Sequence, residues 1–261
     1  MSCLLEALLF DCDGVLSDTE RDGHRIAYNE AFAALGIDAH WDVEEYEVLV
    51  QISGGKERMR FFFTADPENY PLSRFDDQLI KQLYDKKTEI FKSMASAGRL
   101  PCRPGVMRLI KEAHQRGVEL FMCSTAHRDS VAAIIRSNMG DEYLGYFTDL
   151  LCGDIVTKKK PEPDIYLFAL NQYNLDKDRC IVVEDSRNGL LAATNAGIRC
   201  IVTPSYYTEN EDFSEADLVV SNLGEADNPT RFIKGPEILR NITQVNVDCL
   251  NKLLYENMVL S

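Results

Sequence analysis

Short apolar runs and amphipathic helical stretches organise most of this chain. The first apolar run, residues 4–10, is bounded by acidic residues, as expected for a buried strand. From residue 19 to residue 98 the apolar positions recur at helical spacing instead, and no segment there alternates like a strand. We therefore expect an all-helical insert directly after the first strand.

Beyond residue 104, predicted helices and strands follow one another in turn. Helices are predicted over residues 106–116, 129–137, 164–173, 189–196 and 245–260, and strands over residues 118–123, 149–152, 180–183, 200–202 and 216–221. This order is typical of a parallel sheet covered on both faces. The predicted fold is a doubly wound, Rossmann-like α/β core over residues 1–18 and 104–261, with a helical cap domain over residues 19–103.

Composition and charge narrow the range of partners. The 261 residues carry a formal net charge of −14, which repels nucleic acid and anionic membranes. No run approaches the roughly 18 apolar residues that span a bilayer. The eight cysteines form no C-x-x-C pair, and several lie in apolar runs, so we expect reduced and buried thiols. An anionic small-molecule substrate would need a local basic pocket or a metal ion, and the net charge by itself is explained by solubility.

Polar residues collect where the predicted strands end. Asp11 and Asp13 follow the first strand, Ser124 ends the second, Lys160 comes after the third, and Glu184–Asp185 ends the fourth. Alone, each stretch has an ordinary explanation as a solvated turn, a helix cap or a charged surface. Because parallel strands direct their carboxyl ends to one crevice, the combination indicates a single site.

The residue types at these strand ends suit phosphoryl transfer. Asp11 and Asp185, with Glu184 nearby, offer the oxygen ligands that Mg²⁺ prefers. A metal-bound Asp11 beside a positive pocket can attack phosphorus and form an aspartyl-phosphate. Asp13 can give a proton to the leaving oxygen as general acid, and can then serve as general base for water.

The phosphoryl oxygens of a bound substrate also need hydrogen-bond donors. Lys160 and the Ser124 hydroxyl are the candidates for this contact. The helix N-termini that are predicted after Thr125 and Asp185 would add amide donors. We therefore predict four catalytic residues, Asp11, Asp13, Ser124 and Lys160.

The four motifs in this order resemble the haloacid-dehalogenase superfamily of phosphohydrolases. They are D-x-D-G-V, a strand-end Ser/Thr, a lysine before Pro-x-Pro, and E-D-S, and together they extend over nearly the whole chain. The resemblance implies Mg²⁺ dependence, with metal contacts from Asp11, the Asp13 backbone carbonyl and Asp185, and with Glu184 close by. A haloacid dehalogenase would lack the second aspartate, so Asp13 favours phosphorus chemistry over halogen chemistry.

The predicted cap resembles that of CbbY-type proteins, on the stretches "DTERDGHRIAYNEAF" and "ISGGKERM". The resemblance implies a phosphatase that converts xylulose-1,5-bisphosphate to xylulose 5-phosphate. It also implies a location in the chloroplast stroma if a targeting segment was removed, and otherwise in the cytoplasm, as a soluble monomer. For charges on the cap, a solvated helix surface is the alternative explanation. The candidate substrate-binding residues are Glu20, Arg21, Gly23, His24, Arg25, Gly54, Gly55, Lys56, Arg58 and Thr125.

A phosphosugar mutase similar to β-phosphoglucomutase is the alternative activity. In that enzyme the cap histidine follows the D-T aspartate by five residues, whereas here His24 follows Asp18 by six and Gly23 occupies the mutase position. A helix turns by about 100° per residue, so a shift of one residue points the imidazole in a different direction. The spacing favours the phosphatase.

Overall fold

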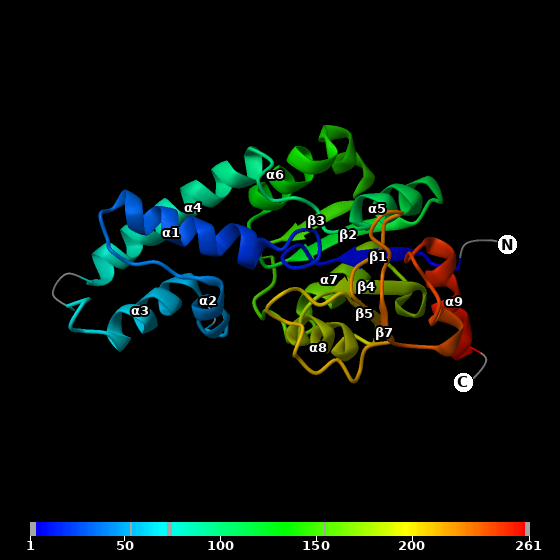
Figure 1. Cartoon of the computed structure of the whole chain (residues 1–261). Coiled ribbons are helices and arrows are strands. Elements are labelled where there is room, and N and C mark those ends of the chain that lie inside the picture. Colours follow the sequence, from blue (N-terminus) through cyan, green and yellow to red (C-terminus); the bar gives the residue numbers. More distant parts are fainter. Residues whose placement is uncertain (1–3, 53, 72–74, 154, 259–261) are drawn as a thin grey trace. The chain divides into compact units, whose positions relative to one another are not determined.

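The computed structural model describes residues 4–52, 54–71, 75–153 and 155–258. The chain divides into two compact units. We call the chain up to Asp18 together with the chain from Pro101 onward the core unit, and Thr19–Leu100 the helical unit (Figure 1). Residues 101–103, which the sequence assigns to the cap domain, thus fall in the core unit. That the helical unit acts as a substrate cap stays a proposal.

A seven-stranded sheet forms the centre of the core unit, with the order β3-β2-β1-β4-β5-β6-β7. The first six strands pair in parallel, and β7 pairs antiparallel to β6. The α/β fold class is confirmed, but β7 was not predicted from the sequence. The strands are β1 (Ala7–Phe10), β2 (Glu119–Ser124), β3 (Asp149–Cys152), β4 (Cys180–Glu184), β5 (Arg199–Val202), β6 (Leu218–Val220) and β7 (Phe232–Lys234).

Helices cover both faces of this sheet (Figure 1). Ala7 and Leu9 point to the face where Ile165 of α7 and Leu190 of α8 complete one apolar cluster. Leu8 lies on the opposite face and is equally inaccessible to water, as expected for a parallel sheet with two covered faces. The helices are α5 (Val106–Gln115), α6 (Arg128–Met139), α7 (Asp164–Tyr173), α8 (Arg187–Asn195) and α9 (Val247–Met258).

The helical unit folds around aromatic side chains. Tyr28, Phe32, Trp41, Tyr46 and Phe63 are almost wholly buried and pack ring against ring, with centroids 4.7–6.3 Å apart. Such pairs add to the stabilisation that comes from their buried area. Among the described residues this unit contains no strand, which confirms the predicted all-helical insert. Its elements are a π-helix (Glu20–His24), α1 (Arg25–Ala34), α2 (Val43–Leu49), α3 (Gly55–Ala65) and α4 (Asp77–Ser96).

Seven of the eight cysteines lie in the described part of the chain, and there all seven are free thiols. Six of them are buried, as predicted, and Cys102 is partly exposed; Cys3 lies outside the described residues. In the same part of the chain, no helix is both long and apolar enough to cross a membrane.

Candidate active site

Three carboxylates meet where β1 and β4 end. These strands are neighbours in the sheet, and Phe10 pairs with Val183. The next residues, Asp11 on one strand and Glu184–Asp185 on the other, therefore emerge side by side. Ligand oxygens of the three carboxylates lie within 4.8 Å of one another, and all three residues are buried. The convergence predicted from the strand ends is thus present for these residues.

Lys160 supplies the positive charge that faces this cluster. Its Nζ donates to Asp11 Oδ1 at 2.6 Å and to the carbonyl of Cys123 at 2.9 Å, and it lies 2.6 Å from Glu184 Oε1. Burial works against the ammonium, but the carboxylates of Asp11 and Glu184 outweigh it and raise the pKa of Lys160. Lys160 therefore stays charged at any physiological pH.

The single positive charge of Lys160 does not balance the negative charges of three buried carboxylates. Burial raises the pKa of Glu184 to about 7, although the neighbouring Lys160 acts in the opposite direction. Burial also raises the pKa of Asp185, with the nearby charges of Asp11 and Glu184 adding to the effect. This excess of negative charge on oxygen donors fits a hard divalent cation, which would relieve the repulsion.

Asp13 lies in the turn after β1, and Ser124 is the last residue of β2. Asp13 forms an isolated backbone bridge with Ser17, within the turn that follows β1. Ser124 ends β2, is buried, and accepts a hydrogen bond from the amide of Ala126 at 3.1 Å. The adjacent Thr125 is exposed. The catalytic roles of Asp13 and Ser124 stay predictions.

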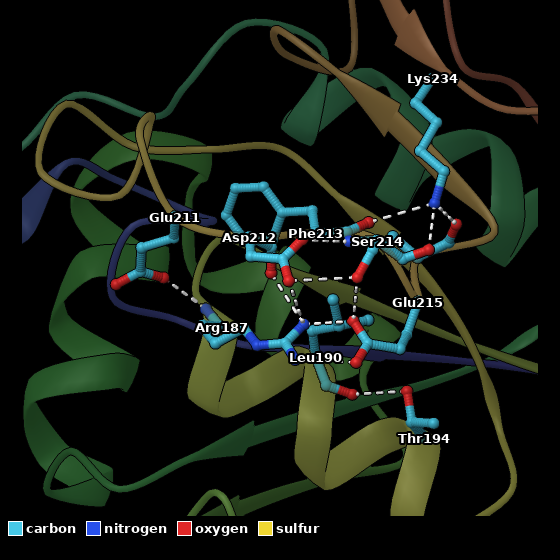
Figure 2. Close-up of polar contacts among 10 residues, drawn as sticks. Arg187, Leu190, Thr194, Glu211, Asp212, Phe213, Ser214, Glu215 and Lys234 are labelled. Carbon is cyan, nitrogen blue, oxygen red and sulfur yellow. Dashed lines mark hydrogen bonds and ion pairs between the residues drawn. The ribbon is translucent and has the colours of Figure 1, made fainter.

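The segment between β5 and β6 encloses the Asp185 backbone. Thr208 Oγ1 donates to the carbonyl of Asp185 at 2.7 Å. Further along, Figure 2 shows Arg187, the first residue of α8, held by three acidic residues of this segment. Its amide donates to Glu211, and its guanidinium donates to the Asp212 carbonyl at 2.8 Å and to Glu215 Oε1 at 2.7 Å. These contacts fix the start of α8 directly after the acidic pair.

A helical glycine leaves room for one of the clustered carboxylates. A Cβ added at Gly189 would lie 1.9 Å from Glu184 Oε2. Alanine in a helix is normally favoured over glycine by about 1 kcal/mol. Here we expect Gly189→Ala to lower stability by about 1–3 kcal/mol, because Glu184 must move. Thermal unfolding measures the effect.

Gly145→Ala is the matched control for this substitution. Gly145 lies in a short 3₁₀ helix (Asp141–Tyr146), and a Cβ there would meet no atom within 4 Å. We expect its melting temperature to stay close to that of the natural protein. An unchanged or raised melting temperature for Gly189→Ala would contradict the close approach of Gly189 to Glu184.

Within the helical unit, a second polar cluster joins three predicted residues to two that the sequence analysis missed. The hydroxyl of Tyr46 donates to Glu20 Oε2 at 2.6 Å, and Arg58 binds both of these groups. Lys87 Nζ lies 3.0 Å from His24 Nδ1. Burial, together with the charge of Lys87, lowers the pKa of His24 to about 3, so this imidazole is neutral at physiological pH.

The remaining candidates in the helical unit have contacts of their own. Arg21 pairs with Asp22, and Arg25 donates to the carbonyl of Trp41 at 3.2 Å. Lys56 lies over the Tyr84 ring at 5.1 Å. The three predicted glycines are each closely packed. A Cβ at Gly23 would meet Phe91 and Leu100, and one at Gly54 would meet Glu57. A Cβ at Gly55 would meet Tyr28 and Tyr84. The substrate-binding roles of these residues stay predictions.

Comparisons with known proteins identify the family of this chain. The model of the haloacid dehalogenase-like hydrolase family matches residues 5–197, which include Asp11, Lys160 and Asp185. A CBBY-like protein of Arabidopsis thaliana is 43% identical over 228 residues, which are 86% of this chain and 71% of the relative. Protein CbbY of Cereibacter sphaeroides is 40% identical over 225 residues, 85% of this chain and 94% of the relative.

Solved structures of CbbY from Rhodobacter sphaeroides have the same fold. The alignment has a TM-score of 0.71 at 41% sequence identity, and it covers 84% of this chain and 94% of CbbY. One of these crystal structures is a complex with phosphate, and another, of a point mutant, is a complex with xylulose-(1,5)bisphosphate. This chain therefore belongs to the haloacid dehalogenase-like hydrolases, as a phosphatase similar to CbbY.

Proposed function

We propose that this protein is a Mg²⁺-dependent phosphatase of a small sugar phosphate, with xylulose-1,5-bisphosphate as substrate and xylulose 5-phosphate and phosphate as products. The observation that carries the proposal is the buried cluster of Asp11, Glu184 and Asp185 with Lys160 at its edge. The choice of substrate rests on the similarity to CbbY, whose point mutant was crystallised with this bisphosphate.

Asp11 is the proposed nucleophile. Its carboxylate oxygen attacks phosphorus, the bond from phosphorus to the sugar oxygen breaks, and Asp13 gives that oxygen a proton. Asp13 then takes a proton from water, the water oxygen attacks phosphorus, and the bond to Asp11 breaks. The enzyme returns to its starting state, with phosphate released.

Lys160 and Ser124 are proposed to hold the phosphoryl oxygens, because a charged donor beside the reacting group stabilises the charge that develops there. Mg²⁺ would be held by Asp11, Asp185 and the Asp13 carbonyl, with Glu184 nearby. When bound, it neutralises carboxylates and phosphoryl oxygens at the same time. Members of this superfamily generally use a divalent metal, and the three buried carboxylates fit one.

Selection of the sugar is proposed to lie with the helical unit. Arg58 and Lys87 are buried cations suited to a second phosphate, and Glu20 is suited to sugar hydroxyls. This assignment rests on the chemistry of the side chains.

A panel of pentose and hexose mono- and bisphosphates, assayed for released phosphate with Mg²⁺ and with a chelator, tests the proposal. We expect the highest kcat/KM for xylulose-1,5-bisphosphate and no release in the chelator. Conversion of β-glucose 1-phosphate to glucose 6-phosphate is measured in parallel. If this isomerisation is the only reaction observed, the protein is a mutase and the proposed substrate is wrong.

A further inference from the structure

Arg103 joins three loops at the carboxyl edge of the sheet. Its guanidinium donates to the carbonyl of Gly14, after β1, and to the carbonyls of Thr203 and Pro204, after β5, both at 2.7 Å. It also donates to the carbonyl of Ser221, after β6, at 3.3 Å. The guanidinium holds its donors in a fixed planar fork on a long stem, so it reaches carbonyls of separate loops that one compact ammonium on a shorter stem does not span.

On the β1 side, Arg103 holds the loop that carries Asp13. Besides the contact with the Gly14 carbonyl, the amide of Arg103 donates to the carbonyl of Leu16 at 2.8 Å. Gly14 has a φ of 80°, and a Cβ there would lie 2.0 Å from Asp185 Oδ2. The bare backbone of Gly14 thus packs directly against a carboxylate of the acidic cluster.

On the β5 side, Arg103 holds the backbone that encloses the acidic pair. The amide of Thr203 donates to the carbonyl of Glu184 at 2.8 Å. Five residues further on, Thr208 donates to the carbonyl of Asp185. The Arg103 guanidinium therefore reaches backbone on both sides of Asp185: Nη1 donates to the carbonyls of Gly14 and Thr203, and Nη2 donates to that of Pro204.

We propose that Arg103 is a positioning residue for the metal-binding carboxylates: by holding Gly14 and the Thr203–Pro204 backbone in one fork, it sets the separation between the Asp11–Asp13 loop and Asp185. The proposal rests on the proposed metal-dependent function. It assigns Arg103 no contact with the substrate. Displacement of either the Gly14 loop or the Thr203–Pro204 backbone would change the distance between Asp11 and Asp185, which must share one ion.

The chain offers a matched control in Arg108, on α5. Its guanidinium likewise donates to backbone carbonyls, those of Leu223, Gly224 and Val245, at 2.8–3.2 Å. These carbonyls lie on the segment between β6 and α9, which carries no residue of the acidic cluster. Loss of Arg108 thus removes a comparable backbone anchor from the same unit.

Calorimetric titration with Mg²⁺ alone, on the full chain, tests the proposal without a substrate. For Arg103→Met we expect the Kd for Mg²⁺ to rise by about tenfold or more, the scale on which loss of a supporting residue around a metal acts. We expect kcat to fall by about 10²-fold with KM changed less, as for misplaced catalytic groups. Arg108→Met should lower the melting temperature and leave the Kd for Mg²⁺ within about twofold.

Arg103→Lys separates position from charge, and it provides a milder change if Arg103→Met does not fold. Because lysine is shorter and its single nitrogen cannot also replace the Nη2 contacts with the Pro204 and Ser221 carbonyls, we expect this variant to lose most of the Mg²⁺ affinity that Arg103→Met loses. Natural affinity in Arg103→Lys, or equal losses in Arg103→Met and Arg108→Met, would overturn the proposal. If the natural protein itself binds no Mg²⁺, the proposed metal-dependent function fails instead.

Discussion

Replacement of Asp11 by asparagine is expected to lower kcat for phosphate release by roughly 10⁴-fold or more, the scale seen when a covalent nucleophile is removed. The amide has nearly the same shape as the carboxylate, but its oxygen carries no charge and is a poor nucleophile at phosphorus. Phosphate release from xylulose-1,5-bisphosphate at saturating Mg²⁺ measures the effect.

Asp149→Asn is the matched control for Asp11→Asn. Asp149 lies at the start of β3, away from the strand ends that carry the acidic cluster, and its carboxylate accepts from Tyr173 and Arg128. Its replacement should leave kcat close to the natural value. Undiminished activity in Asp11→Asn would remove Asp11 from the mechanism.

Replacement of Lys160 by methionine should affect both activity and stability. We expect kcat to fall by about 10³-fold, the upper range for loss of one donor to a charged transition state. The metal-free protein should lose about 3–5 kcal/mol of stability, because Asp11 and Glu184 lose the cation that they share. Mg²⁺ should restore part of this loss, so its addition raises the melting temperature more than in the natural protein.

The pH dependence of stability provides a second measurement on Lys160→Met. Burial already holds the pKa of Glu184 at about 7, above its usual value. Loss of Lys160 raises this pKa further, so the folded state binds more protons than the unfolded state between roughly pH 5 and 8. The variant should therefore lose stability as pH rises through this range in a chelator.

Lys159→Met provides the comparison for Lys160→Met. The adjacent Lys159 donates to the carbonyl of Gly153 at 2.6 Å, outside the acidic cluster. We expect a small change in stability and no added response to Mg²⁺. If both variants respond to Mg²⁺ and to pH alike, Lys160 does not balance the acidic cluster.

The core of the site could be predicted because it follows from the order of elements along the chain. Asp11 and Asp185 come directly after strands and Glu184 ends one. Neighbouring parallel strands bring such residues together whatever the loops do. Lys160 was predicted from its place after β3 together with its motif, although it approaches Asp11 from a loop several residues beyond the end of that strand. The register between β1 and β4 then sets which residues face one another.

Other parts could not be predicted because they depend on packing between distant segments. Lys87 lies on a long amphipathic helix, where a lysine normally faces water, and only the fold turns it toward His24. Arg103 lies in a proline-containing link, with acceptors from three separate loops. The strand β7 has three residues, two of them exposed, so it lacks the apolar pattern of the inner strands.

The most direct test of the account is to capture the phosphoryl group on the protein. The enzyme is mixed with radiolabelled xylulose-1,5-bisphosphate and Mg²⁺, stopped with acid within the first turnover, and digested for peptide mapping. We predict label on Asp11, at a level that falls as phosphate is released, and none on the Asp11→Asn variant. Label on another residue, or release of phosphate with no labelled peptide at any time, would contradict the proposed route through Asp11.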